Sequence, residues 1–231
     1  MLLLAADTSS PSGSLAVLRD DEVLGARHAV SDEAYSSRLF RDLESLLLDL
    51  SLELKDFDGF AVVSGPGSFT GLRVGLTTAK AWAEAYAKPV FGVSALEAVA
   101  IQSPSACPVL VPVMDARRQQ LYYGIFQNDA GPALLRGEEK VGSPEEVLED
   151  LSRVREKSSF ALVAYDRELV MRTLPGIEQI SPILNIVSPA LAPWIGRIAL
   201  AQARSGKSSD SLTLDANYVR RSDAEVHRKG R

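Results

Sequence analysis

The sequence predicts an α/β protein made of two duplicated halves, each with the element order β-β-β-α-β-α. The first observation is a repeat, because an apolar strand ending at an Asp, a polar turn and a return strand occur at residues 3–18 and again at 109–126. In each half the hydrophobic period then indicates a third strand, a helix, a strand and another helix. The 231 residues, 46% of them apolar, can form one large core or two small ones. We therefore expect mixed sheets flanked by helices, with any ligand in the cleft between the halves.

The first half is expected at residues 1–102. Its apolar runs predict strands at residues 2–6, 14–18, 22–30 and 59–64. Its helical periods predict helices at 31–50 and 72–87, the second of them rich in alanine. Between the last strand and the second helix lies a glycine-rich turn, residues 65–71.

The second half is expected at residues 109–219, after a junction rich in Ser and Pro at 103–108. Its predicted strands cover residues 109–114, 120–127, 132–141 and 160–164, and its predicted helices cover 143–153 and 193–204. Ser143 as cap and Pro144 at the first position mark the start of the first of these helices. Residues 220–231 form a polar tail with five basic and two acidic side chains, which we expect to be solvated and flexible.

Charge and composition exclude several classes of protein. A net charge of −5 disfavours unaided nucleic-acid binding, so any RNA should be held by a partner. The single cysteine, Cys107, cannot form an internal disulfide and is expected to be a small buried side chain. The chain lacks a basic leader and an apolar run of about 20 residues. These features predict a cytoplasmic protein that does not enter a membrane.

The most informative segment is the glycine-rich turn, which lies between a predicted buried strand and a predicted helix. Its glycines permit close backbone approach, and Ser68 or Thr70 can cap the helix. Free amides at the helix start could hold a phosphate, yet the segment matches neither a P-loop nor a dinucleotide fingerprint. A tight packed turn is the alternative interpretation. The hydroxyl-rich turn after the first strand presents the same choice between phosphate binding and a structural role. The candidate phosphate-binding residues of the two turns are Asp7, Thr8, Ser9, Gly65, Pro66, Gly67, Ser68, Phe69, Thr70, Gly71 and Arg73.

No catalytic residue and no metal site is predicted. The two histidines, His28 and His227, are far apart in the sequence and have no ligand spacing, and a structural zinc needs about four ligands. A Gly-x-Ser-x-Gly elbow with a plausible His partner is also absent.

The two helices of the first half are more apolar than packing on one sheet requires. The second half is the default cover for the surplus apolar surface, and another subunit is the alternative. We predict a helix-bundle contact with a partner or with a second copy of the chain. The residues expected in it are Leu39, Phe40, Leu43, Leu46, Leu47, Leu50, Leu76, Ala79, Ala83 and Tyr86.

Residues 65–75, GPGSFTGLRVG, resemble the signature of the TsaB (YeaZ-type) family. The resemblance extends along nearly the whole chain, through residues 7–9 (DTS), 92–97 (GVSALE), 115–118 (DARR) and 217–220 (NYVR). Two departures stand out. The last element lacks the family's usual proline and has Val219 in place of Leu, and Tyr35 stands where many members carry a His.

The resemblance implies an actin-like ATPase (ASKHA) fold of two RNase-H-like halves. It also implies a scaffold subunit that is not an enzyme by itself and that pairs with the catalytic TsaD-type subunit. With the TsaE-type ATPase, this pair supports transfer of threonylcarbamoyl to the tRNA adenosine beside the anticodon. ATP and metal would belong to the partner subunits, tRNA would be reached only through the complex, and a homodimer could form when the chain is alone. Members are described as joining their partner through first-half helices, the two noted above.

The alternative is an actin-like-fold ATP-binding enzyme, a kinase or ATPase, that acts alone. It would use Asp7, Thr8 and the turn at residues 65–71 on a nucleotide. A metallopeptidase comes third, and it would need bound metal.

Overall fold

The structure, a computed structural model, describes residues 1–30, 35–128, 136–180 and 183–219. The chain divides into two compact units. The first unit contains Met1–Ala95 together with the described part of Ala190–Arg231, and the second contains Leu96–Pro189. Each unit is built around one five-stranded sheet.

The first sheet has the strand order β3-β2-β1-β4-β5. Strands β1, β2 and β3 pair antiparallel, whereas β4 and β5 add parallel to β1. The five strands are β1 (Leu2–Asp7), β2 (Ser14–Arg19), β3 (Glu22–His28), β4 (Gly59–Gly65) and β5 (Val90–Ser94). Since β1 is buried along its whole length in the centre of the sheet, its terminal Asp7 is carried into the interior.

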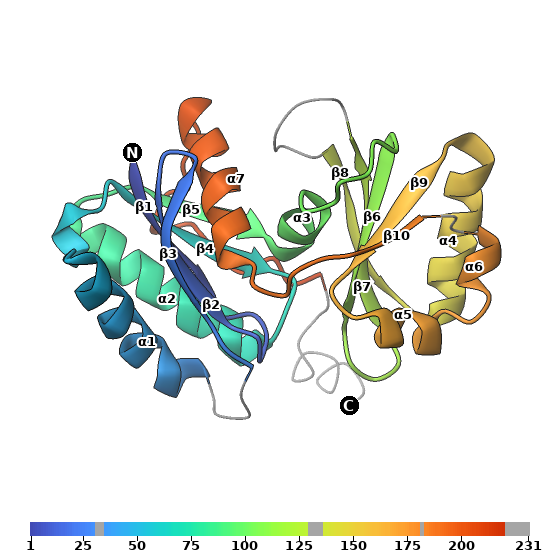
Figure 1. Ribbon diagram of the computed structural model, residues 1–231, viewed down its shortest axis with the longest axis horizontal. Helices are drawn as coiled ribbons and strands as arrows, with labels where there is room; N and C mark the ends of the chain where they lie inside the picture. The colour runs from blue at the N-terminus through green and yellow to red at the C-terminus, as the bar shows by residue number, and fades with distance from the viewer. Residues whose placement is uncertain (31–34, 129–135, 181–182, 220–231) are drawn as a thin grey trace, which may run out of the picture. The chain divides into compact units, whose positions relative to one another are not determined.

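Helices cover both faces of the first sheet (Figure 1). Helices α1 (Tyr35–Leu50) and α2 (Phe69–Tyr86) lie side by side on one face, where α1 packs on β3 and α2 packs on β4. A short 3-10 helix, η1 (Leu54–Asp56), precedes β4. Helix α7 (Ala192–Arg204) covers the other face and packs on β1 and β2.

The second sheet repeats the topology of the first. Its order is β10-β9-β6-β7-β8, with antiparallel pairs β6/β7 and β7/β8 and parallel pairs β6/β9 and β9/β10. The strands are β6 (Val109–Asp115), β7 (Leu121–Gln127), β8 (Arg136–Gly142), β9 (Phe160–Ala164) and β10 (Ile183–Ile186). The helices between Leu96 and Pro189 are α3 (Ala95–Ala100), which starts at the unit boundary, α4 (Pro144–Lys157), α5 (Arg167–Thr173) and α6 (Ile177–Ile180). This repetition confirms the duplicated α/β architecture predicted from the two strand–Asp–turn–strand segments.

The structure adds elements that the sequence does not predict and shifts others. Each sheet has a fifth strand, β5 or β10, and α3, α5 and α6 are short helices of four to seven residues. The second helix begins at Phe69 rather than at residue 72, because Ser68 already caps it. Ser143 caps α4 as expected, with Pro144 at its start. The strand predicted at 132–141 is described from Arg136 onward, and its earlier part lies outside the described residues.

The two units do not coincide with the expected halves 1–102 and 109–219. Residues 96–102 group with the second unit, and the described residues from 190 to 219 group with the first. The physical reason is that α7 follows the second sheet in the chain but packs its buried side chains on β1 and β2. The tail at 220–231 lies outside the described residues. None of the described helices is long and apolar enough to span a membrane.

Candidate functional site: three sequence motifs meet in the first unit

Asp7 ends β1 in a fully buried position. Its Oδ1 accepts hydrogen bonds from the backbone N–H and the hydroxyl of Ser9, at 2.8 and 2.6 Å. Its Oδ2 has no hydrogen-bond partner in the described structure. Burial raises the pKa of the Asp7 carboxyl to about 6, although the two bonds from Ser9 oppose the shift. The site therefore contains a carboxyl that is close to half-protonated near pH 6.

The glycine-rich turn packs directly on the turn that follows Asp7. The backbone N–H of Ser68 donates to the carbonyl of Ser9 at 2.7 Å, and the hydroxyl of Thr8 donates to the carbonyl of Gly71 at 2.7 Å. The Gly65–Pro66 peptide bond that opens the turn is cis. Two segments about 60 residues apart in sequence are thus joined by backbone and side-chain hydrogen bonds.

Three glycines of the motif are required by this packing. A Cβ added at Gly67 would lie closer than 3.0 Å to Ser9, and one added at Gly71 or Gly75 would lie closer than 3.0 Å to Thr8. The close approach that these glycines permit is therefore made by the chain's own Thr8 and Ser9. Packing alone accounts for their spacing, which supports the tight-turn interpretation of the motif.

The segment that follows α7 closes the same region. The backbone N–H of Asn217 donates to the carbonyl of Ser64 at 2.7 Å. Gly65, with φ +138, leaves no room for a side chain beside the Asn217 carbonyl. Further back along the segment, Lys80 Nζ donates to the carbonyl of Leu214 at 3.0 Å, and Ser209 pairs with Val90 at the edge of the sheet. The first strand end, the glycine motif and the segment at 209–218 therefore meet in one place.

An exposed cluster of three side chains lies at this meeting point. The rings of Phe69 and Tyr218 stack with centroids 5.2 Å apart, and the Arg73 guanidinium lies 3.9 Å from the Phe69 centroid. Arg73 Nε also donates to the Tyr218 hydroxyl at 3.3 Å. Phe69 and Tyr218 are 38% and 37% exposed, so part of each ring faces solvent. Tyr218 is not among the residues of the predicted site. The sequence feature that could have identified it is an aromatic residue just before a basic tail.

The predicted phosphate-binding residues are therefore brought together, but with different exposure. Five are buried: Asp7, Thr8, Ser9, Gly65 and Pro66. Gly67 and Gly71 are half-buried. Four are exposed: Ser68, Phe69, Thr70 and Arg73. The Ser68 hydroxyl accepts from the Gly71 N–H, so it caps α2 and satisfies one of the free amides at the helix start.

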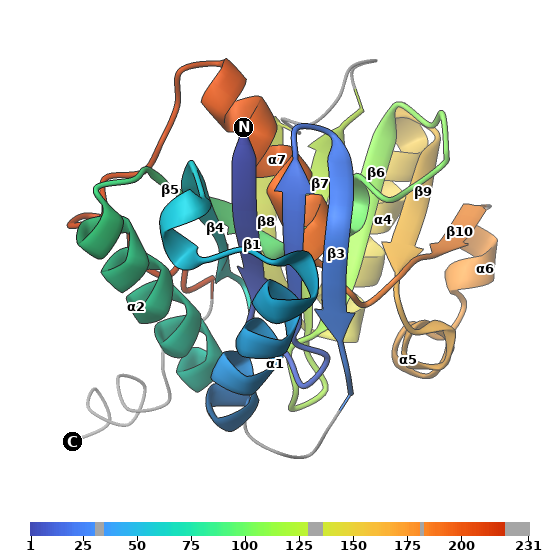
Figure 2. The same ribbon diagram turned by 60° about the vertical axis from the view of Figure 1, so that its left-hand side comes forward.

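Much of the predicted partner surface is buried inside the first unit. Figure 2 turns α1 and α2 toward the viewer. Six of the ten residues are buried, and they are Leu39, Leu43, Leu46, Leu76, Ala79 and Ala83. Leu47 and Leu50 are half-buried, and Phe40 and Tyr86 are 58% and 36% exposed. The predicted surface omits Leu48, although it is 72% exposed on α1. Tyr35 begins α1, but its side chain lies outside the part of the chain that is described.

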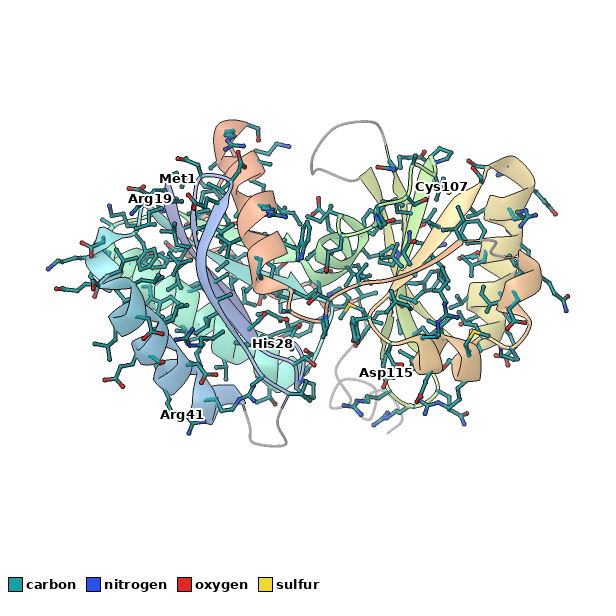
Figure 3. All side chains as sticks on the ribbon, viewed as in Figure 1. Met1, Arg19, His28, Arg41, Cys107 and Asp115 are labelled. Atoms are coloured by element: carbon teal, nitrogen blue, oxygen red, sulfur yellow. The ribbon has the colours of Figure 1, made fainter. Side chains whose placement is uncertain are left out.

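No group of three or more His, Cys, Asp or Glu side chains that could hold a metal ion occurs among the described residues. His28 lies exposed at the end of β3, at the far end of the sheet from Met1 and Arg19 (Figure 3). His227 lies outside the described residues. Cys107 is buried and free, as predicted.

Comparison with known proteins gives the family. Residues 27–162 match the family model described as TsaD, tRNA N6-adenosine threonylcarbamoyltransferase. The tRNA threonylcarbamoyladenosine biosynthesis protein TsaB of Escherichia coli is 31% identical over 159 residues, which cover 67% of this chain and 68% of that protein. The chain belongs to the TsaB (YeaZ-type) family. TsaB of Bacillus subtilis is 36% identical over 131 residues, or 57% of each chain, so the chain spans less than two thirds of that relative's length.

A solved structure of YeaZ from Pseudomonas aeruginosa superposes with a TM-score of 0.77 at 25% identity. The superposition covers 94% of this chain and 99% of the YeaZ chain. Together with the two sheets of identical topology, this match confirms the actin-like α/β fold implied by the TsaB-type motifs.

Proposed function

We propose that this TsaB-family chain is a non-catalytic scaffold subunit in the biosynthesis of tRNA threonylcarbamoyladenosine, pairing with a TsaD-type catalytic subunit. Relatives in E. coli and B. subtilis carry the name of that biosynthesis, and the matched family model is described as the transferase itself. A TsaE-type ATPase would act with the pair, ATP and metal would be held by those partners, and the complex would work in the cytoplasm.

The observation that carries the pairing is an apolar face on the solvent side of α1. Phe40 and Leu48 are 58% and 72% exposed, and Leu47 is half-buried. Spacings of seven and eight residues are about two helical turns, so the three side chains fall on one face. Exposed apolar patches of this kind mark protein–protein contacts. The same face would be available to a second copy of the chain when no partner is present.

The pairing predicts the behaviour of a variant that carries Phe40→Asp and Leu48→Asp. Association with the TsaD-type subunit should weaken at least about thirtyfold, because charges would replace central apolar contacts. Thermal unfolding should be unchanged, since both positions are exposed. Titration calorimetry measures the affinity for the purified partner, and light scattering measures the mass of the complex.

Leu212→Asp is the matched control, because Leu212 is an 80% exposed leucine that lies outside α1. It should bind the partner like the unaltered chain. Wild-type affinity in the double variant would remove α1 from the contact, and no association of the unaltered chain would overturn the pairing itself.

A second candidate, the ATP-binding enzyme acting alone, is favoured by one observation: the buried Asp7 Oδ2 has no partner in the described structure. A divalent cation needs six or more oxygen ligands, so Asp7 could contribute one while phosphate and water supplied the rest. The amides of the glycine motif are less suited, because those of Ser68 and Gly71 already donate to Ser9 and to the Ser68 hydroxyl.

This enzyme hypothesis predicts that the isolated chain binds Mg-ATP with micromolar or better affinity, and that Asp7→Asn abolishes the binding. We expect instead no measurable heat of binding in titration calorimetry with the isolated chain. Tight, Asp7-dependent binding would reverse the order of the two candidates.

A further inference from the structure

An acidic side chain lies in the middle of the apolar face of α1. Glu44 follows Phe40 by four residues and precedes Leu48 by four, so the three side chains lie on successive turns of one side of the helix. All three are exposed. The Glu44 carboxylate therefore lies between the two exposed apolar side chains that we propose as the contact with the TsaD-type subunit.

Within the part of the chain that the structure describes, the Glu44 carboxylate forms no hydrogen bond and no ion pair. Two other charged side chains of α1 differ in this respect, because Asp49 pairs with Arg27 of β3 and Arg41 has an interaction within the chain. A partner that covers the face removes the water that solvates Glu44. Since burial of an unpaired carboxylate is unfavourable, a partner that binds tightly must bring a cation to this position.

A second copy of the chain would bring a carboxylate to this position instead. In a two-fold contact both copies use the same patch, so the residue at its centre faces its own counterpart. Two Glu44 side chains would then oppose each other in a contact from which water is largely excluded. Opposed like charges disfavour an interface, whereas opposite charges fix its partner.

We propose that Glu44 is a specificity-determining residue, which selects a partner helix that places a Lys or Arg opposite it and disfavours self-association of the chain through α1. The proposal rests on the proposed pairing, because it names the chemistry of the partner at the same face. Phe40 and Leu48 offer apolar contact area to either occupant, and the charge of Glu44 discriminates between the two.

The heterodimer is tested with variants that change the charge at this position. Glu44→Gln keeps the size of the side chain, and its affinity for the purified TsaD-type subunit in titration calorimetry should fall at least about tenfold. Glu44→Lys should bind more weakly still, because it would oppose two cations. Thermal unfolding of both variants should be unchanged, since Glu44 is exposed. Glu178→Gln removes an exposed carboxyl from α6 in the second unit and should bind like the unaltered chain.

Self-association should change in the opposite direction. In sedimentation equilibrium of the isolated chain, Glu44→Gln should dimerise at least about tenfold more tightly than the unaltered chain, because the repulsion is removed while Phe40 and Leu48 remain. Glu178→Gln should leave self-association unchanged. A general effect on folding or solubility would not move the two affinities in opposite directions.

Unchanged affinity of Glu44→Gln for the partner would overturn the selection of a cation, and unchanged self-association would overturn the repulsion between copies. The variant with Phe40→Asp and Leu48→Asp separates these results from a failure of the pairing. If it loses the partner while Glu44→Gln retains it, α1 is the contact and Glu44 does not select the partner. If neither variant loses the partner, the contact lies outside this face, and the proposed surface fails together with the role of Glu44.

Discussion

Replacing Gly71 with alanine should lower the free energy of unfolding by about 3 kcal/mol or more. Gly71 lies in the first turn of α2, where helix propensity alone favours alanine over glycine by up to about 1 kcal/mol. The added Cβ, however, would lie closer than 3.0 Å to the carbonyl oxygen of Thr8. That oxygen is backbone and cannot rotate aside, and moving the turn would break the hydrogen bond from the Thr8 hydroxyl to Gly71. The steric conflict therefore outweighs the propensity.

Urea denaturation followed by far-UV circular dichroism measures this change. Gly176→Ala is the control, because Gly176 has a positive φ of +83 but no atom within 4 Å of an added Cβ. Its cost should be limited to the backbone conformation, about 1 kcal/mol. If Gly71→Ala unfolds at the same urea concentration as the wild type, the close approach of the two turns does not require glycine at this position. The presence of Gly71 would then need another explanation.

The sequence predicts the central strands well because their signals are local. Residues 2–7 and 109–115 are apolar runs that end at an Asp, and each forms the centre of its sheet. The missed strands are edge strands of four and five residues, β10 and β5. Short strands like these resemble ordinary apolar loop segments, so no periodicity separates them from loops.

The errors at the site have tertiary causes. The sequence pattern divides the glycine motif into a turn and a helix at residue 72, because three glycines are unfavourable in a helix. The helix nevertheless begins at Phe69, since Ser68 caps it and Thr8 fills the space beside Gly71. The place of α7 could not be predicted, because no pattern within residues 192–204 identifies which sheet their buried face will cover.

The partner surface shows the same limit. An apolar stripe on a helix gives the direction of burial but not the width of the surface that the rest of the chain covers. Leu39, Leu43 and Leu46 are inside the first unit, whereas Leu48, which lies off the stripe, remains exposed. The part of α1 that remains exposed, and that we propose as the contact, is therefore its outer side.

The second large effect is expected at Asp7, where stability should depend on pH. The pKa of its carboxyl is about 6 in the folded chain, against 3.8 for an Asp that is not buried, as in the unfolded chain. Below pH 4 both states are protonated, so Asp7 has no effect on stability there. Between pH 4 and 6 the unfolded chain loses its proton while the folded chain keeps it, so folding becomes less favourable as pH rises. Above pH 6 the full cost, about 3 kcal/mol, is present.

Asp7→Asn removes this cost without changing the shape of the side chain. The Asn oxygen can still accept both hydrogen bonds from Ser9. Its amide group, however, would lack a partner where Oδ2 now lies, and this would cancel about 1 kcal/mol of the gain in stability. The variant should therefore exceed the wild type by about 2 kcal/mol in free energy of unfolding at pH 8, and this advantage should disappear by pH 4. Urea titrations at pH 4, 6 and 8 measure the difference, and Glu44→Gln, which removes an exposed carboxyl from α1, should leave the pH dependence unchanged.

A stabilising Asp7→Asn substitution would mean that the native carboxyl is retained at a cost to folding. Residues of that kind are typical of functional sites rather than of structural ones. The unpartnered Oδ2 would then be explained by a function, because packing does not require it. A cation or a proton bound at Asp7 would be the candidate for that function. A destabilising substitution at pH 8 would show that the two bonds from Ser9 need the charged oxygen, and Asp7 would then be a structural lock on the turn that receives the glycine motif.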